Sequence, residues 1–307
     1  MITLTLKEQP NVPLEAEAIS PDVMAKLGHD EVCALPMFLG KRQCRLDDFF
    51  DVDGETSEKL EIRGDTGRVK WIGRGMTRGH LNIVGNAGMH LGAYMKGGTI
   101  DVSGNASDWV GGEMSGGLIR IRGNAGGQIG AAYRGSLTGM TDGTILIEGA
   151  AGLEVGMRMK RGIIAVKGSV KDFAGLEMKG GTLILGNAEL RTGAWMIRGT
   201  IVSLTPIPLL PTFAYASSCN PTFLHLCAKH LQTQGFSIPY EVNDGAYLLY
   251  SGDAAVSRKG EILIWQPHDH PITPAADPAG AVVPDSRGNR PPHGKAHSLP
   301  WSPPCPH

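Results

Sequence analysis

The sequence has few aromatic residues, few cysteines and no proline over a long central stretch. Aromatic residues make up 6% of the 307 residues, and no proline occurs between Pro36 and Pro206. The 5 cysteines include no C-x-x-C pair, which argues against a zinc site, an iron–sulfur cluster or a disulfide framework. No apolar run is long enough to span a bilayer, and residues 1–10 lack the core of a signal peptide. We therefore expect a cytoplasmic chain without a membrane-spanning segment and without a bound metal.

Positive charge is not in excess either, since the formal net charge at pH 7 is −1. This balance argues against a dedicated nucleic-acid binder, because such domains are usually strongly basic. The charge is uneven along the chain: residues 1–59 carry 6 basic and 12 acidic groups, whereas residues 60–204 carry 17 basic and 11 acidic groups. This asymmetry is compatible with charged protein partners.

Glycine is abundant instead, and most of it lies in the proline-free middle of the chain. Between Gly64 and Gly199 lie 33 of the 43 glycines, whereas 11 of the 20 prolines lie in the last 41 residues. The last segment has no apolar periodicity, and we expect it to be disordered. We therefore divide the chain into an N-terminal cap (1–59), a repeat region (60–204), a C-terminal cap (205–266) and a disordered tail (267–307).

The glycines of the middle region follow one period. Intervals of 19, 19, 26, 19, 19 and 18 residues separate the members of one row, Gly79, Gly98, Gly117, Gly143, Gly162, Gly181 and Gly199. Seven methionines keep the same spacing: Met76, Met95, Met114, Met140, Met159, Met178 and Met196. The 26-residue interval is one period with seven added residues, so segment 131–138 is expected to form a loop outside the repeat.

Each repeat alternates apolar and polar residues, as in Thr-Ile-Asp-Val-Ser at 99–103, and this period of two is typical of β-strands. A 19-residue repeat is too short for two helices, which excludes arrays of helical hairpins. A left-handed hexapeptide helix would need three similar faces in each repeat, and the sequence lacks them. The predicted fold class is therefore all-β: a right-handed parallel β-helix of about seven coils with small mixed α/β caps.

The methionine row is expected in the interior as a structural ladder, because methionine is flexible and fills irregular gaps in a core. The alternative, a metal or redox site of stacked thioethers, is disfavoured on the same ground. Gly-Asn-Ala recurs at 85–87, 104–106, 123–125 and 186–188. We interpret these segments as corners, because glycine and asparagine tolerate a positive φ.

Both caps contain predictable elements. In the N-terminal cap we expect a strand at 2–7, a short helix at 21–28 and a second helical turn at 29–35. In the C-terminal cap we expect a helix from Pro221 to about Gln232, followed by strands at 247–251 and 261–265.

Sequence motifs for catalysis are missing, and we assign no catalytic residue. The chain contains no G-x-S-x-G, no phosphate-binding loop and no H-E-x-x-H. Asp101 and Glu113 stand alone in their repeats, whereas glycoside-cleaving enzymes need clustered carboxylates. The tripeptide 268–270, His-Asp-His, could bind a metal, but its place in the tail disfavours a preorganised site. His80 and His90 have no repeated partner in the sequence.

Basic residues follow the methionine row in most repeats. If the repeats stack, these side chains form a stripe of like charge, which is unfavourable unless it is solvated or paired. A solvated rim is the simpler interpretation; the alternative is a stripe that binds an acidic partner subunit or an anionic cofactor tail. The candidate binding residues are Lys96, Lys160, Arg161, Lys179 and Arg198, with Arg78 in an earlier repeat.

Repeats of the form Met-x-x-Gly-x-Ile-x-Val-x-Gly, as at 95–104 and 159–168, resemble the C subunit of formylmethanofuran dehydrogenase. They also resemble the C-terminal domain of the glutamate synthase large subunit. The extended repeat with Gly-Met-Thr-Asp-Gly at 139–143 and the segment Leu-Pro-Thr-Phe at 210–213 look like the formylmethanofuran dehydrogenase family. The similarity is to the bacterial version, in the formyltransferase/hydrolase complex, and it covers roughly residues 1–266.

The resemblance implies a non-catalytic scaffold with no cofactor bound by this chain itself. The complex would transfer a formyl group between tetrahydromethanopterin and a methanofuran-type cofactor and release formate, in the one-carbon metabolism of formaldehyde oxidation. The implied partners are a formyltransferase, a metal-dependent hydrolase-like subunit and a molybdopterin-subunit-like protein. Two alternatives stay open: a glutamate synthase-type structural module, and a stand-alone carbohydrate-active β-helix enzyme.

Overall fold

A computed structural model describes residues 1–55, 57–238 and 246–266 of the chain. These residues belong to one compact unit, 1–273, and a second unit, 274–307, lies outside the described residues. The expected disorder of the tail and its His-Asp-His tripeptide at 268–270 therefore also lie outside them. No helix of the described ranges combines the length and the apolarity that crossing a membrane requires.

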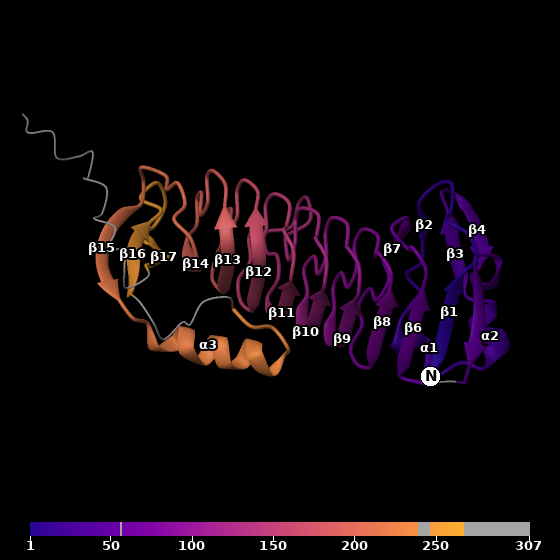
Figure 1. Cartoon of the computed structure of the whole chain (residues 1–307). Coiled ribbons are helices and arrows are strands. Elements are labelled where there is room, and N and C mark those ends of the chain that lie inside the picture. Colours follow the sequence, from indigo (N-terminus) through magenta and orange to yellow (C-terminus); the bar gives the residue numbers. More distant parts are fainter. Residues whose placement is uncertain (56, 239–245, 267–307) are drawn as a thin grey trace, which may run out of the picture. The chain divides into compact units, whose positions relative to one another are not determined.

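The described chain is mostly β and is dominated by one sheet of 13 strands (Figure 1). A run of neighbouring strands in this sheet is parallel, as the repeat pattern predicts. In spatial order these strands are β1 (Ile2–Leu6), β6 (Lys59–Arg63), β8 (His80–Val84), β9 (Lys96–Val102), β10 (Ser115–Ile121), β11 (Asp142–Ile147), β12 (Ile163–Val170), β13 (Thr182–Ala188), β14 (Arg198–Ser203) and β17 (Lys259–Gln266).

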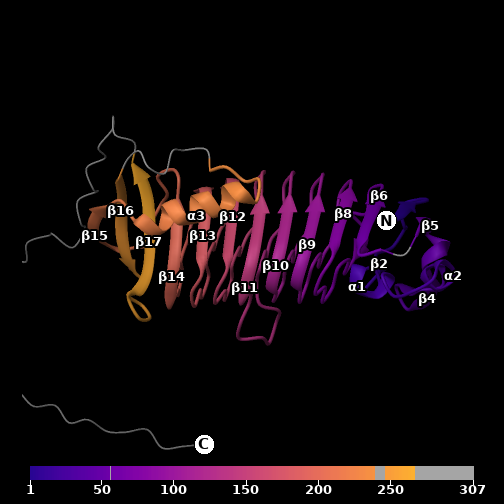
Figure 2. The ribbon, with the colours of Figure 1, turned by 90° about the horizontal axis from the view of Figure 1, so that it is seen from below.

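The strand register reproduces the period of the sequence. Ile100 on β9 pairs with Ile119 on β10, and Ile119 pairs with Ile145 on β11 across the 26-residue interval. Equivalent side chains of neighbouring strands therefore stack about 4.8 Å apart, and these isoleucines are fully buried. The inserted residues leave the ladder undisturbed, and Figure 2 shows the loop that they form projecting between β10 and β11.

Three of the Gly-Asn-Ala segments form corners held by a ladder of asparagine side chains. Asn86 Oδ1 accepts from the Asn105 backbone N–H at 2.9 Å, and Asn105 Oδ1 accepts from the Asn124 N–H at 2.8 Å. The fourth segment, 186–188, is not a corner, because β13 runs through it to Ala188. There Asn187 pairs with Ser169 of β12 after a shift in register, so the ladder between these two strands continues through the segment.

Antiparallel strands close the sheet at both ends. At one end β5 (Phe50–Gly54) pairs antiparallel with β1; at the other, β16 (Ala246–Gly252) pairs with β17 and β15 (Ala214–Cys219) pairs with β16. The expected strands at 2–7, 247–251 and 261–265 are confirmed within a residue or two. The sequence did not predict β15, which has no buried alternation.

The N-terminal cap departs from prediction in two respects. Helix α1 (Pro21–Met24) is shorter than the expected 21–28, because only turn-type hydrogen bonds continue beyond it, whereas α2 (His29–Cys33) matches the second helical turn. Three strands of the cap also form a small sheet with the first part of the repeat region, which sequence analysis missed. Its strands are β4 (Arg42–Arg45), β3 (Pro36–Leu39), β2 (Leu14–Glu15) and β7 (Val69–Lys70), with a 3-10 turn at Leu46–Asp48 nearby.

Helix α3 (Thr222–Thr233) agrees with the expected helix at 221–232 and lies along one face of the large sheet (Figures 1 and 2). Leu224 and Leu231 are buried on its sheet-facing side. They pack against the outward-facing apolar side chains of five strands, Leu146, Ala165, Ile184, Val202 and Leu263. The described residues thus form two cores, one inside the repeats and one beneath α3.

Candidate functional site

The seven methionines of the sequence ladder all lie in the interior, each fully buried. Their packing explains the glycine row, because the methyl groups of the first six lie where a glycine of the next repeat would carry a Cβ. A Cβ on Gly117 would lie 2.6 Å from Met95 Cε, and one on Gly162 would lie 2.7 Å from Met140 Cε. The row therefore serves packing, with methionine filling the space that glycine leaves open.

The basic stripe is divided by the structure. Lys160 and Lys179 are direct neighbours, since the Lys179 N–H donates to the carbonyl of Met159 at 2.7 Å. Lys96 is separated from Lys160 by the repeats of β10 and β11, which carry Ser115 and Thr141 at the equivalent positions. The cations around Lys160 and the isolated Lys96 are thus separate surfaces.

Two further cations continue the stripe that the sequence analysis ended at Arg198. Strand β17 pairs with β14 so that Lys259 lies opposite Arg198 and Ile201 opposite Ile262. Arg258 precedes Lys259, and both are exposed. A signal was available in the sequence, because Lys259-Gly260-Glu261-Ile262 repeats the order of Arg198-Gly199-Thr200-Ile201.

A row of rings lies along the turns before β8 to β11. Trp71, His90 and Trp109 occupy equivalent positions in successive repeats, all with left-handed backbone (φ 67°, 64° and 66°). The Trp71 and His90 rings stack with centroids 4.0 Å apart, and His90 and Trp109 are 6.3 Å apart. His90 therefore lies between the indole rings of the two neighbouring repeats. His80 Nε2 lies 3.3 Å from Asp101 Oδ2 of the next repeat.

The loop at 131–138 contributes Tyr133 to this aromatic row. Its ring lies 4.7 Å from that of Trp109, and its hydroxyl is hydrogen-bonded to His90 Nδ1 at 2.9 Å. Glu113 fixes the loop by accepting from the Tyr133 backbone N–H at 2.9 Å. Burial raises the pKa of the Tyr133 hydroxyl, with a further contribution from neighbouring Tyr94 and Glu113. Tyr133 therefore stays protonated. It contacts both His90 and Trp109, which belong to two successive repeats.

Burial lowers the pKa of His90 to about 4, and the Lys70 ammonium contributes in the same direction while Asp108 opposes it. In the unfolded chain the His90 imidazole takes up a proton near pH 6.5, but in the folded chain only near pH 4. The free energy of unfolding therefore falls as the pH drops from 6.5 to 4. Because His90 is only half-buried, we expect a loss of about 1 to 2 kcal/mol rather than the full shift. Urea unfolding at pH 7 and pH 4.5 should show a larger loss for the protein than for His90→Asn, which keeps the left-handed turn. An equal loss in both would contradict this.

A hollow of about 270 Å³ lies beside the aromatic row and is lined by Glu17, Arg74, Gly75, Tyr94 and Lys96. The Arg74 guanidinium lies over the rings of Trp71 and Tyr94, 5.3 and 5.5 Å from their centroids. It also forms an ion pair with Glu17. The Arg74 guanidinium thus already has an anionic partner in Glu17. The Lys96 ammonium lies at the rim of the hollow.

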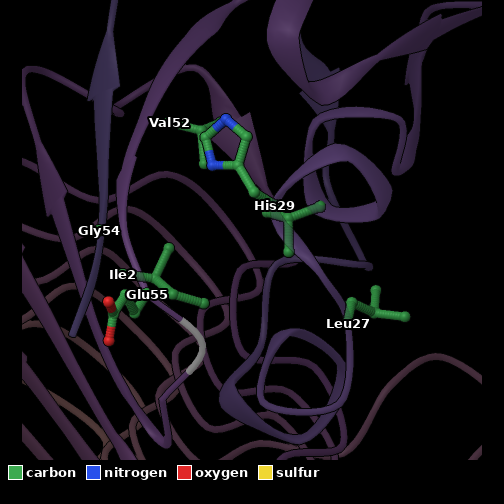
Figure 3. A pocket seen from close by; sticks show the side chains of 7 residues that line it. Ile2, Leu27, His29, Val52, Gly54 and Glu55 are labelled. Atoms are coloured by element: carbon green, nitrogen blue, oxygen red, sulfur yellow. The ribbon is translucent and has the colours of Figure 1, made fainter.

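A second hollow, of about 200 Å³, lies in the N-terminal cap between β1, β5 and α2. Its walls are mainly apolar, formed by Ile2, Leu27, Val32 and Val52. Figure 3 shows the His29 ring and the Glu55 carboxylate on opposite sides, so they do not form an acid–base pair. The described ranges contain no group of three or more His, Cys, Asp or Glu side chains suited to a metal ion.

The carboxylates of the repeats are paired with neighbouring repeats rather than convergent. Arg120 forms a two-bond ion pair with Asp101, and Arg158 Nε lies 2.9 Å from Glu177 Oε2. Each pair joins residues 19 apart, so it lies between successive repeats. Such pairs hold the repeats together and leave these carboxylates engaged.

Comparisons with known proteins match both the repeats and the caps. Residues 65–208 match the family described as the GXGXG motif. Over 269 residues the chain is 44% identical to the C subunit of the tungsten-containing formylmethanofuran dehydrogenase 2 of Methanococcus maripaludis, an alignment that covers 85% of this chain and 95% of that protein. The protein of the same description from Methanothermobacter marburgensis is 43% identical over 97 residues, so this chain spans only 36% of that relative's length.

A solved structure extends the likeness to three dimensions. It is the X-ray crystal structure of the formyltransferase/hydrolase complex (FhcABCD) from Methylorubrum extorquens in complex with methylofuran. One of its chains is similar to this chain with a TM-score of 0.79 and 30% identity. The similarity covers 85% of this chain and 98% of that one, so the caps are included as well as the repeats.

Proposed function

The chain belongs to the family of formylmethanofuran dehydrogenase C subunits, and from this premise we propose that it is the non-catalytic scaffold subunit of a formyltransferase/hydrolase complex. The complex would transfer a formyl group between tetrahydromethanopterin and a methanofuran-type cofactor and release formate. The reacting groups would be held by partner chains: a formyltransferase, a metal-dependent hydrolase-like subunit and a molybdopterin-subunit-like protein. We place the complex in the cytoplasm.

The observation that carries this proposal is the near-complete match, 98% of its length, to a chain of a formyltransferase/hydrolase complex. Because the match includes both caps, it favours this role over a glutamate synthase-type module, which shares only the glycine repeat. The paired carboxylates of the repeats are consistent with a supporting role, since they join neighbouring repeats. The stacked register likewise supports the right-handed parallel β-helix as the form of the repeats.

The test is purification of the full chain from its native source through an N-terminal tag. We expect other subunits to purify with it in fixed stoichiometry and the preparation to release formate from formyl-tetrahydromethanopterin when a methanofuran-type cofactor is present. The same chain produced alone should fold and release no formate. Formate release by the chain alone, or cleavage of polysaccharides by it, would overturn the scaffold role.

A further inference from the structure

One surface of the C-terminal repeats concentrates unpaired positive charge. It is built by residues just before β12 and β13 and at the start of β14 and β17, and their pairing places Lys160 beside Lys179 and Arg198 beside Lys259. None of its cations forms an ion pair with a residue that the structure describes. They are Lys160, Arg161, Lys179, Arg198, Arg258 and Lys259, and all but the half-buried Lys179 are exposed.

This concentration costs stability in the isolated chain. Like charges on opposed positions of neighbouring repeats repel one another, whereas several cations elsewhere in the repeats have acidic partners, as Arg158 has in Glu177. Two carboxylates near these cations accept backbone hydrogen bonds instead: Asp142 from the Gly143 N–H at 2.8 Å, and Asp253 from the Trp195 N–H at 2.8 Å. An anionic surface brought against these cations would relieve the repulsion.

Large apolar side chains are exposed on the same surface. Trp195 is 54% exposed, and Ile197 and Val256 are also exposed. Hydrogen bonds fix the backbone of two of these residues: Asp253 Oδ2 accepts from the Trp195 N–H at 2.8 Å, and the Ser257 hydroxyl donates to the Ile197 carbonyl. Since Ile197 occupies the position next to Lys179 in the ladder, the apolar group lies directly beside the cations.

The inserted loop adds a fourth apolar side chain at the other edge. Leu137 is 73% exposed, and Lys179 donates from Nζ to its carbonyl. Arg158 donates to the Ser136 carbonyl at 2.8 Å, which fixes the loop a second time. Exposed apolar groups on a fixed backbone are typical of protein contact surfaces, because little conformational entropy is lost on binding.

We propose that this basic–apolar face docks a partner subunit that presents an apolar patch bordered by carboxylates. The inference rests on the proposed function and adds to it the face through which the scaffold holds a neighbour. A flexible anionic tail would satisfy the cations but would leave Trp195, Ile197, Val256 and Leu137 in water. A folded partner covers both kinds of group, with the tryptophan as its natural anchor.

The experiment uses the intact complex, isolated through the tagged chain. A carbodiimide, which joins amines to carboxylates in direct contact, is expected to link Lys160, Lys179 or Lys259 to one partner subunit. The triple variant Lys160→Glu/Lys179→Glu/Arg198→Glu should lower the amount of that subunit at least tenfold. So should Trp195→Asn/Val256→Asn, which removes apolar area without changing charge and keeps a residue that tolerates a positive φ at 195.

The matched control is Lys41→Glu/Arg42→Glu/Lys171→Glu, an equal charge change on exposed residues elsewhere, which should leave the complex intact. Circular dichroism and thermal unfolding of each variant exclude misfolding as the cause. Full assembly of both test variants would overturn the inference while leaving the scaffold role in place. Loss of an anionic cofactor with all subunits retained would also overturn it, by assigning the face to a cofactor tail. A wild-type chain that purifies alone would instead contradict the proposed function.

Discussion

Replacement of Gly162 by alanine is expected to destabilise the protein by about 3 kcal/mol or more. The new Cβ would lie 2.7 Å from both Met140 Cε and the Gly143 carbonyl oxygen, and the backbone there has φ +92°. The methionine could move, but the carbonyl belongs to the neighbouring strand and is fixed by the ladder. Urea unfolding followed by circular dichroism measures the change.

A control variant separates two causes of the lost stability: the overlap of the new Cβ with neighbouring atoms, and the cost of a side chain on a residue with positive φ. Gly40 also has a positive φ (+63°), but a Cβ there would meet no atom within 4 Å. Gly40→Ala should therefore lose only about 1 kcal/mol, the cost of a side chain on a left-handed residue. If the two variants lost the same stability, overlap with Met140 and the Gly143 carbonyl would not be the reason for the glycine row.

Leu231→Asp is expected to detach helix α3 from the sheet. Leu231 is fully buried beneath the helix, so truncation alone would cost about 2 to 5 kcal/mol, and an unpaired carboxylate costs more. Detachment uncovers the apolar strip of Leu146, Ala165, Ile184, Val202 and Leu263. We expect faster amide hydrogen exchange over 222–233, binding of a hydrophobic dye and aggregation.

The same helix supplies the control for this variant. Leu226 is 66% exposed on α3, so Leu226→Asp introduces the same charge on the solvent side. It should leave the exchange rates of the helix and the solubility of the protein close to those of the wild type. Equal effects of the two substitutions would mean that helix propensity, rather than docking on the sheet, controls the stability of α3.

The repeat region was predictable because its restraints are periodic. Each repeat leaves the same space for side chains of the next one, so glycine and methionine recur at fixed intervals. These intervals reveal the strand ladder in the sequence. The segment at 186–188 failed as a corner because the β12–β13 ladder continues through it after a shift in register, and Gly-Asn-Ala fits an extended bulge as well as a turn.

The aromatic row could not be predicted from residue types, because its repeated property is a backbone conformation. Trp71, His90 and Trp109 share a positive φ with later members as different as Gln128 and Glu154. Glycine and asparagine were the signals that sequence reasoning used for such turns, and these positions carry neither. Their place two residues before the glycines at 73, 92 and 111 was the available signal.

Sequence analysis also missed the position of α3, although the outward-facing residues of the strands indicate it. The outward residue is Asp101 on β9 and Arg120 on β10 but Leu146 on β11 and Ile184 on β13. An apolar residue on an outward position requires a cover, and the amphipathic segment 222–233 was the available one. Comparing equivalent positions along the row, instead of each strand alone, would have predicted the contact.

The reversal of strand direction at both ends of the large sheet sets a limit on growth. A parallel stack of near-identical units is a template onto which another molecule could add indefinitely, and fibres form in this way. A second molecule that added at one end would meet β5, which runs antiparallel to β1 and presents the exposed carboxylates of Asp51 and Asp53. At the other end it would meet the polar edge of β15. Polymerisation is thereby disfavoured, and variants that lose either border strand should form filaments visible by electron microscopy.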